Sequence, residues 1–134
     1  MNRMFCTRVF RYSGIYGIAI LVPLYLLEDE IALQFPPVIS HPEQFYGFIG
    51  VALAWQFAFL TISRDVVRFR PLMVPAILEK VLSASSTVWL YLDGRVARPL
   101  VAPAFADLVI AVLFVASYWR TMPRGYDRGQ RPYW

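Results

Sequence analysis

The stretch Leu72–Leu92, LMVPAILEKVLSASSTVWLYL, decides the fold, because it is apolar enough to cross a membrane yet carries two adjacent opposite charges. As a helix it would be about 31 Å long at ~1.5 Å per residue, which matches a hydrocarbon core of about 30 Å. Pro71 stands where a first helical residue is expected, and Asp93-Gly94 has the composition of a turn. The sequence therefore predicts a membrane-spanning helix here.

The two charges inside this stretch are Glu79 and Lys80. A charged side chain near the centre of a bilayer costs about 2.5–3.5 kcal/mol on insertion scales. Side chains on a helix lean toward its N-terminus, so we expect Lys80 to extend its ammonium toward the nearer membrane face. Glu79 is too short to do the same, and we expect it to find a partner inside the protein.

The composition of the whole chain is that of a membrane protein. Of its 134 residues, 58% are hydrophobic and 16% charged, whereas soluble domains carry about 25% charged residues. Cys6 is the only cysteine and His41 the only histidine. This excludes an intramolecular disulfide, a four-cysteine metal site and a bis-histidine haem, and we expect no cofactor. Cys6 is either an unmodified residue at the membrane interface or a lipidated one.

Three further apolar runs complete an all-α, antiparallel four-helix transmembrane bundle in a single domain. The expected spans are residues 10–27, 45–62, 72–92 and 100–119, followed by a basic tail over residues 120–134. The first run is expected to be a retained span, because no small-x-small cleavage site follows it. Segment 31–39 contains a Pro-Pro pair and is too short to span, so it is expected to lie along the interface. Ser40 and Glu43 fit a capping box for the second span.

Small residues predict where the helices pack closely. Gly14 and Gly17 in the first run would let another helix approach. The second span carries a longer stripe, which we name the small-residue stripe and expect to face another helix: Gly47, Gly50, Ala54 and Ala58. The spacing of four residues from Gly50 through Ala54 to Ala58 is typical of close helix–helix packing in membranes.

The distribution of arginine predicts the orientation. With four spans, ten arginines fall on one side of the membrane, and only Arg95 and Arg98 fall on the other. The positive-inside rule then places both termini in the cytoplasm of a multi-pass protein of the inner (plasma) membrane. The arginines flank apolar runs, so we expect contact with lipid headgroups rather than with nucleic acid.

Polar side chains inside the spans are the candidate functional residues. Gln56 and Glu79 lie at a similar depth if the second and third spans are antiparallel neighbours, and Ser83 lies one turn beyond Glu79. This intramembrane cluster is either a polar clasp between helices or a site for a proton or a cation in a transporter.

The fourth span contributes Asp107, which lies nearer the opposite face of the membrane. Because its side chain is expected to lean away from Lys80, a Lys80–Asp107 salt bridge is disfavoured. The expected partner of Asp107 is Ser86, Tyr91 or Arg95.

Four short spans with Gly47 and Gly50 near the start of the second, and with intramembrane Glu79 and Asp107, resemble the broad DoxX-like group of small bacterial membrane proteins. The resemblance implies the four-span architecture and assigns no functional residue. Small multidrug-resistance transporters also have four spans, but their essential glutamate lies in the first span, which here has no acid up to Leu27.

These observations predict a structural or accessory membrane protein that binds membrane lipid, another membrane protein or a second copy of itself. The alternative is a small proton- or cation-coupled transporter that uses Glu79 or Asp107. An enzyme acting on lipids or quinones has the least support, since no catalytic residue is identified. His41 and Glu43 are too few to predict a metal site.

Overall fold

The computed structural model of the chain describes residues 3–27, 30, 41–96 and 98–122. Its helices are α1 (Arg3–Leu26), α3 (Pro42–Arg64), α4 (Met73–Leu92) and α5 (Val101–Arg120), with short 3-10 turns η1 (Arg70–Leu72) and η2 (Arg98–Leu100). Within these ranges there is no strand, and the prediction of an all-α fold is confirmed for them. The predictions for segment 31–39, Ser40 and the tail from residue 123 lie outside the described residues.

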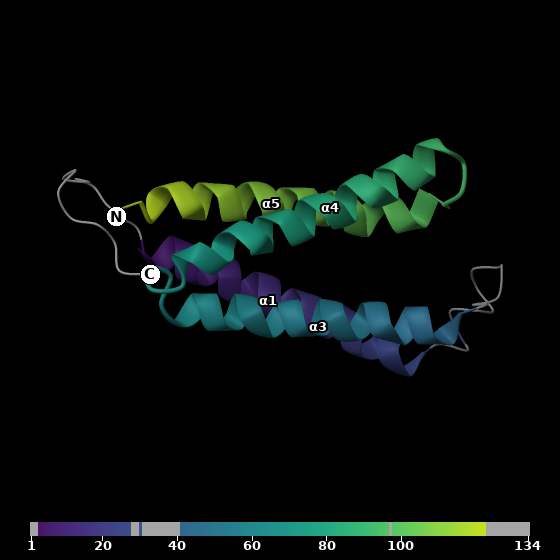
Figure 1. Cartoon of the computed structure of the whole chain (residues 1–134), viewed down its shortest axis with the longest axis horizontal. Helices are drawn as coiled ribbons and strands as arrows, with labels where there is room; N and C mark the ends of the chain where they lie inside the picture. Colours follow the sequence, from purple (N-terminus) through teal and green to yellow (C-terminus); the bar gives the residue numbers. More distant parts are fainter. Residues whose placement is uncertain (1–2, 28–29, 31–40, 97, 123–134) are drawn as a thin grey trace.

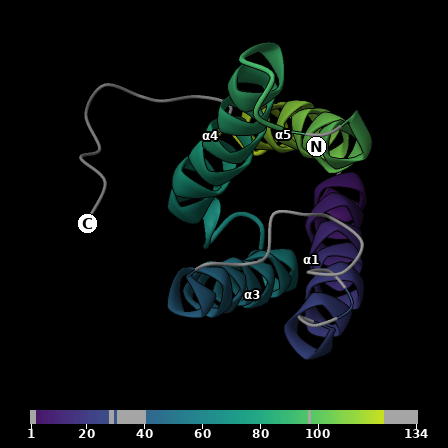
Figure 2. The ribbon, with the colours of Figure 1, turned by 90° about the vertical axis from the view of Figure 1, so that its right-hand side faces the viewer.

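The four long helices form two antiparallel pairs (Figure 1). α1 packs along α3, and α4 packs along α5; between the pairs, α1 has the larger contact, with α5, whereas α3 and α4 touch only sparsely. An end-on view shows α4 and α5 together above α1 and α3 (Figure 2). The second and third spans are antiparallel, as predicted, but they do not pack against each other along their length.

The connection between α3 and α4 explains this arrangement. Asp65 Oδ1 accepts hydrogen bonds from the backbone N–H groups of Val67 and Arg68, at 3.2 and 3.1 Å, and so turns the chain directly after α3. The turn η1 follows, and Val66 is buried beneath it. This compact connection carries the chain across the end of the bundle, so α4 begins beside α5 instead of folding back along α3.

The two ends of the bundle differ. The start of α1, the α3–α4 connection and the end of α5 lie at one end, which we call the arginine end because it carries Arg3, Arg64, Arg70 and Arg120. The opposite end, which we call the acidic end, carries Glu30, Glu43 and Asp93. Figure 1 shows the two helix pairs close together at the arginine end and splayed apart toward the acidic end.

Aromatic packing closes the arginine end. Phe10, Phe59 and Phe114 are fully buried and come from three different helices. Phe10 stacks on Phe114 with ring centroids 4.1 Å apart, and Phe59 meets Phe114 edge-on at 5.0 Å. Cys6 is buried in the same cluster, with its Sγ 3.8 Å from the Ser117 carbonyl oxygen. Because the thiol is buried, the structure argues against a lipidated Cys6, while its depth in the membrane stays a prediction.

The close contact between α1 and α3 depends on glycine. A Cβ at Gly14 would lie 2.9 Å from both the Gln56 backbone oxygen and Leu60 Cγ, and a Cβ at Gly17 would overlap the Gln56 side chain. The prediction that these two glycines allow a helix to approach is confirmed.

The small-residue stripe does not have the predicted role within the chain. A Cβ at Gly47 or Gly50 would meet no described atom within 4 Å, and Ala54 is exposed. α3 instead turns a face with larger side chains inward, including Ile49, Gln56 and Phe59. Gly14 and Gly17 of α1 make room for Gln56 and Leu60, so the close contact uses small residues on α1 rather than on α3.

Three of the helices, α1, α3 and α5, are long and apolar enough to cross a membrane by length and composition. α4 is not among them. Its 20 residues equal those of α5, but it includes Glu79 and Lys80, and its second half contains Ser83 and Thr87. These polar side chains lower the hydropathy of α4, and the same side chains form most of the candidate site described below.

Candidate functional site

Three charged side chains meet between α4 and α5. Lys80 Nζ lies 3.0 Å from Asp107 Oδ1 and 3.4 Å from Glu79 Oε2. Lys80 is only 6% exposed, and its ammonium also lies 5.5 Å from the centre of the Phe59 ring on α3. We call Glu79, Lys80 and Asp107 the charged triad.

The triad corrects two predictions. Lys80 does not extend to the membrane face, and the disfavoured Lys80–Asp107 salt bridge is present. Asp107 therefore pairs with Lys80, whereas Ser86, Tyr91 or Arg95 was its expected partner. α4 and α5 pack tightly along their length, so the four methylene groups of Lys80 are long enough to reach Asp107 despite the opposite lean of the two side chains.

Gln56 approaches the same region from α3. It is 2% exposed, and its Nε2 donates to the Ala52 carbonyl oxygen of its own helix at 3.0 Å. Its Oε1 is buried, and no donor for it is found in the part of the chain that the structure describes. The predicted Gln56–Glu79 clasp is therefore not formed, because α3 and α4 are too far apart there.

Gln56 and the charged triad line a cavity of about 370 Å³ between the two helix pairs. Its polar lining consists mainly of Gln56, the charged triad, Ser83 and Thr87. Apolar side chains from α1 and α3 form much of the rest, including Ile20, Leu24 and Phe48. The lining extends to Val96 and Pro103, so the cavity runs from the triad toward the acidic end.

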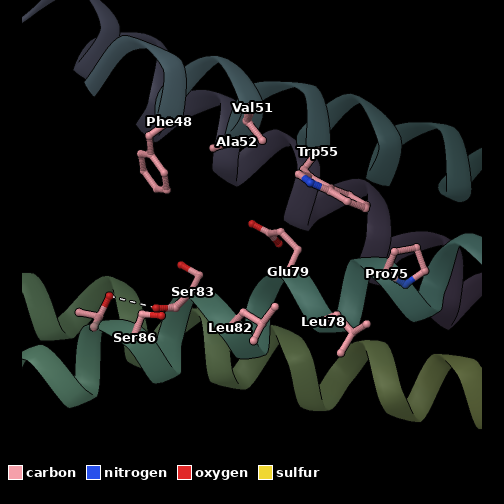
Figure 3. A pocket seen from close by; sticks show the side chains of 11 residues that line it. Phe48, Val51, Ala52, Trp55, Pro75, Leu78, Glu79, Leu82, Ser83 and Ser86 are labelled. Atoms are coloured by element: carbon pink, nitrogen blue, oxygen red, sulfur yellow. Dashed lines mark hydrogen bonds between the residues drawn. The ribbon is translucent and has the colours of Figure 1, made fainter. Parts of the chain in front are cut away.

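A second space, a groove of about 600 Å³, lies between α3 and α4 beside this cavity. The two share part of their lining: Phe48, Ala52, Glu79, Ser83 and Thr87. Figure 3 shows Glu79 extending from α4 toward Phe48, Val51 and Trp55 of α3, into this groove. The groove exists because α3 and α4 have few contacts.

The structure thus brings together all five predicted polar residues of the cluster: Gln56, Glu79, Lys80, Ser83 and Asp107. The contribution of Phe59 to the environment of Lys80, and of Thr87 to the lining, was not predicted. The Thr87 hydroxyl donates to the Ser83 carbonyl oxygen at 3.1 Å, one turn earlier. A serine- and threonine-rich second half of α4 was the available signal for Thr87.

His41 and Glu43 lie away from the cavity, at the exposed start of α3. His41 Nδ1 is 3.2 Å from Glu43 Oε1, and His41 occupies the N-cap position with Pro42 as the first helical residue. Glu43 is thus engaged with the N-cap side chain, while the Ser40 half of the predicted capping box lies outside the described residues.

Comparisons of the chain with protein-family models, with curated proteins and with solved structures found no match.

Proposed function

We propose that this chain is a four-span membrane protein of accessory type, which binds a lipid or another small amphipathic molecule between its helix pairs. The observation that carries the proposal is the cavity, which has mostly apolar walls and a polar floor made by Gln56 and the charged triad. Cavities of about 300–1,000 Å³ are typical of sites for small molecules. The side groove along α3 and α4 offers an apolar tail a path to the surrounding lipid.

The proposal includes α4 as the fourth span. Its length, about 30 Å at ~1.5 Å per residue, suits the hydrocarbon core. Lys80 and Asp107 neutralise each other at 3.0 Å, which reduces the cost of placing charge in the membrane. The exposed Trp89 and Trp119 lie near opposite ends of the bundle, where aromatic side chains favour the membrane interface.

The proposed orientation has the arginine end in the cytoplasm of an inner-membrane protein. Reporter fusions at residue 134 and within the α4–α5 connection test it, with activity expected from a cytoplasmic reporter at the first site and from a periplasmic reporter at the second. A periplasmic signal at residue 134 would contradict the four-span topology.

The binding proposal is tested by purifying the whole protein from membranes in mild detergent and identifying the co-purifying lipids by mass spectrometry. Ser83→Phe places a ring in the cavity, so we expect the specific lipid to be lost. Val81→Phe is the matched control, because Val81 lies on the same helix and lines neither the cavity nor the groove. Identical lipid content in both variants and the unaltered chain would contradict a specific site.

The second candidate function is a small transporter driven by a proton or a cation. It is favoured by the asymmetry of the bundle: aromatic side chains close the arginine end, whereas the cavity runs from the triad toward the acidic end. A transporter that works by alternating access needs a state closed at one end and open at the other, and a second state in which the open and closed ends are exchanged. Proton-coupled uptake in proteoliposomes that disappears in Glu79→Gln would favour this function over the accessory one.

The resemblance to the DoxX-like group stays an expectation from the sequence. The proposed function depends on the cavity and not on that resemblance.

A further inference from the structure

We propose that the molecule bound in the cavity is an amphipathic amine, whose ammonium group pairs with Glu79. This inference rests on the proposed function and deepens it, because it names the chemistry of the ligand at the same site.

The first support is the balance of charge in the triad. Glu79 and Asp107 are carboxylates and Lys80 is the single ammonium between them, so the formal charges sum to −1. Lys80 is closer to Asp107, at 3.0 Å, than to Glu79, whose two carboxylate oxygens lie 3.4 and 3.5 Å from Nζ. Asp107 is thus the closer partner of Lys80, and Glu79 is the carboxylate with capacity for a second cation.

The second support is the pair of buried acceptors without donors. Gln56 Oε1 is buried and accepts no hydrogen bond from any described residue, and the buried Glu79 Oε2 has only the ion-pair contact with Lys80 at 3.4 Å and no hydrogen bond. Both residues line the cavity, and Gln56 is 2% exposed. A buried acceptor without a donor is costly, so a ligand that supplies N–H groups gains from both. An ammonium has three donors and no acceptor, which matches this need.

The third support is the shape and the charge of the route to the site. The cavity runs toward the acidic end, where the exposed carboxylates of Glu30, Glu43 and Asp93 outnumber the two described arginines, Arg95 and Arg98. Carboxylates near an opening raise the local concentration of cations. Apolar side chains along the walls, among them Ile20 and Phe48, then favour a cation with an apolar body over an inorganic ion.

The test uses three probes of matched size: phenylbutylamine, phenylbutanol and phenylbutyrate. Each is titrated by calorimetry into the full-length protein in detergent micelles, with empty micelles as the blank. A hydrogen bond to a charged group contributes enough for an affinity difference of about tenfold or more. We therefore expect the amine to bind at least about tenfold more tightly than the alcohol, and the acid to bind most weakly.

The Glu79→Gln variant should remove the advantage of the amine while leaving the affinity for the alcohol unchanged, which also shows that the cavity is intact. Asp65→Asn is the matched control: it removes an exposed carboxylate at the arginine end, outside the cavity, and the amide oxygen can still accept from the Val67 and Arg68 N–H groups, so the amine should keep its advantage.

Equal affinity for amine and alcohol in the unaltered chain would overturn the inference while leaving the proposed function standing. Preferential binding of the acid would overturn it too, because it would show that the ligand is an anion whose carboxylate pairs with Lys80. Binding of none of the three probes, together with no specific co-purifying lipid, would instead contradict the proposed function itself.

Discussion

The two ends of the bundle are built from the same four helices but by different interactions. At the arginine end, Phe10, Phe59 and Phe114 fill the space between the helix pairs. Toward the acidic end the pairs separate, and the charged triad and Gln56 lie at the bottom of the resulting cavity. The comparison shows that large apolar side chains join the helix pairs at the arginine end, whereas the charged side chains lie where the pairs separate and a cavity remains.

The largest effect is expected from breaking the triad. Lys80→Met leaves Glu79 and Asp107 facing each other without a cation. Removal of one partner from a buried ion pair costs about 3–5 kcal/mol, and we expect a loss of that order in the free energy of unfolding. Thermal unfolding in detergent measures it.

The double variant Lys80→Met with Asp107→Asn provides the control for this prediction. It removes the like-charge contact, so it should be more stable than the single Lys80→Met variant. A double variant less stable than the single one would show that the charges are not coupled as their distances indicate.

The aromatic core at the arginine end is tested by Phe114→Ala. Phe114 is 0% exposed, whereas Phe105 on the same helix is 68% exposed. In soluble proteins a buried Phe→Ala change costs about 3–5 kcal/mol, and in a membrane the part due to lost packing contacts persists. We expect Phe114→Ala to lower the unfolding temperature clearly and Phe105→Ala to leave it nearly unchanged. Equal effects would mean that the core does not hold the helix pairs together.

Several features of this comparison were predictable from the sequence. The helices follow from apolar runs of spanning length, and the polar residues of the site follow from their rarity inside such runs. The sequence could not tell which helices pair, because the short α3–α4 connection reverses the chain but also carries it across the end of the bundle to α5. It also could not show the salt bridge from Lys80 to Asp107, which depends on the rotation of α4 relative to α5.

The role of the small residues was equally hard to predict, for a physical reason. In a soluble helix the buried face is the apolar one, but in a membrane the lipid-facing surface is apolar too. Hydropathy therefore does not distinguish the two faces of α3, and the spacing of Gly50, Ala54 and Ala58 is compatible with either. The structure assigns the close contact to Gly14 and Gly17 of α1.

A pair of glycine substitutions sharpens this point, because the expected effects have opposite signs. Gly14→Ala forces a Cβ against the Gln56 backbone oxygen and Leu60, at 2.9 Å from each, so α1 and α3 must separate. Overpacking of this kind costs about 1–3 kcal/mol. Gly50→Ala meets nothing within 4 Å of the added atom and should stabilise α3 by about 0.5–1 kcal/mol. Both values are obtained from unfolding in the same detergent.

The smallest effect is expected at Ala54, where the sequence alone predicts a disturbed bundle on substitution by phenylalanine. Ala54 is exposed, so the ring of Ala54→Phe would extend into the surrounding lipid or detergent. Exposed substitutions usually change stability by less than about 0.5 kcal/mol, and we expect the unfolding temperature and the oligomeric state to stay as they are. Size-exclusion chromatography with light scattering gives the oligomeric state in the same samples. If Ala54→Phe dissociates a larger assembly while each chain stays folded, the small-residue stripe packs against a second copy, because bulk at such a face separates two helix backbones.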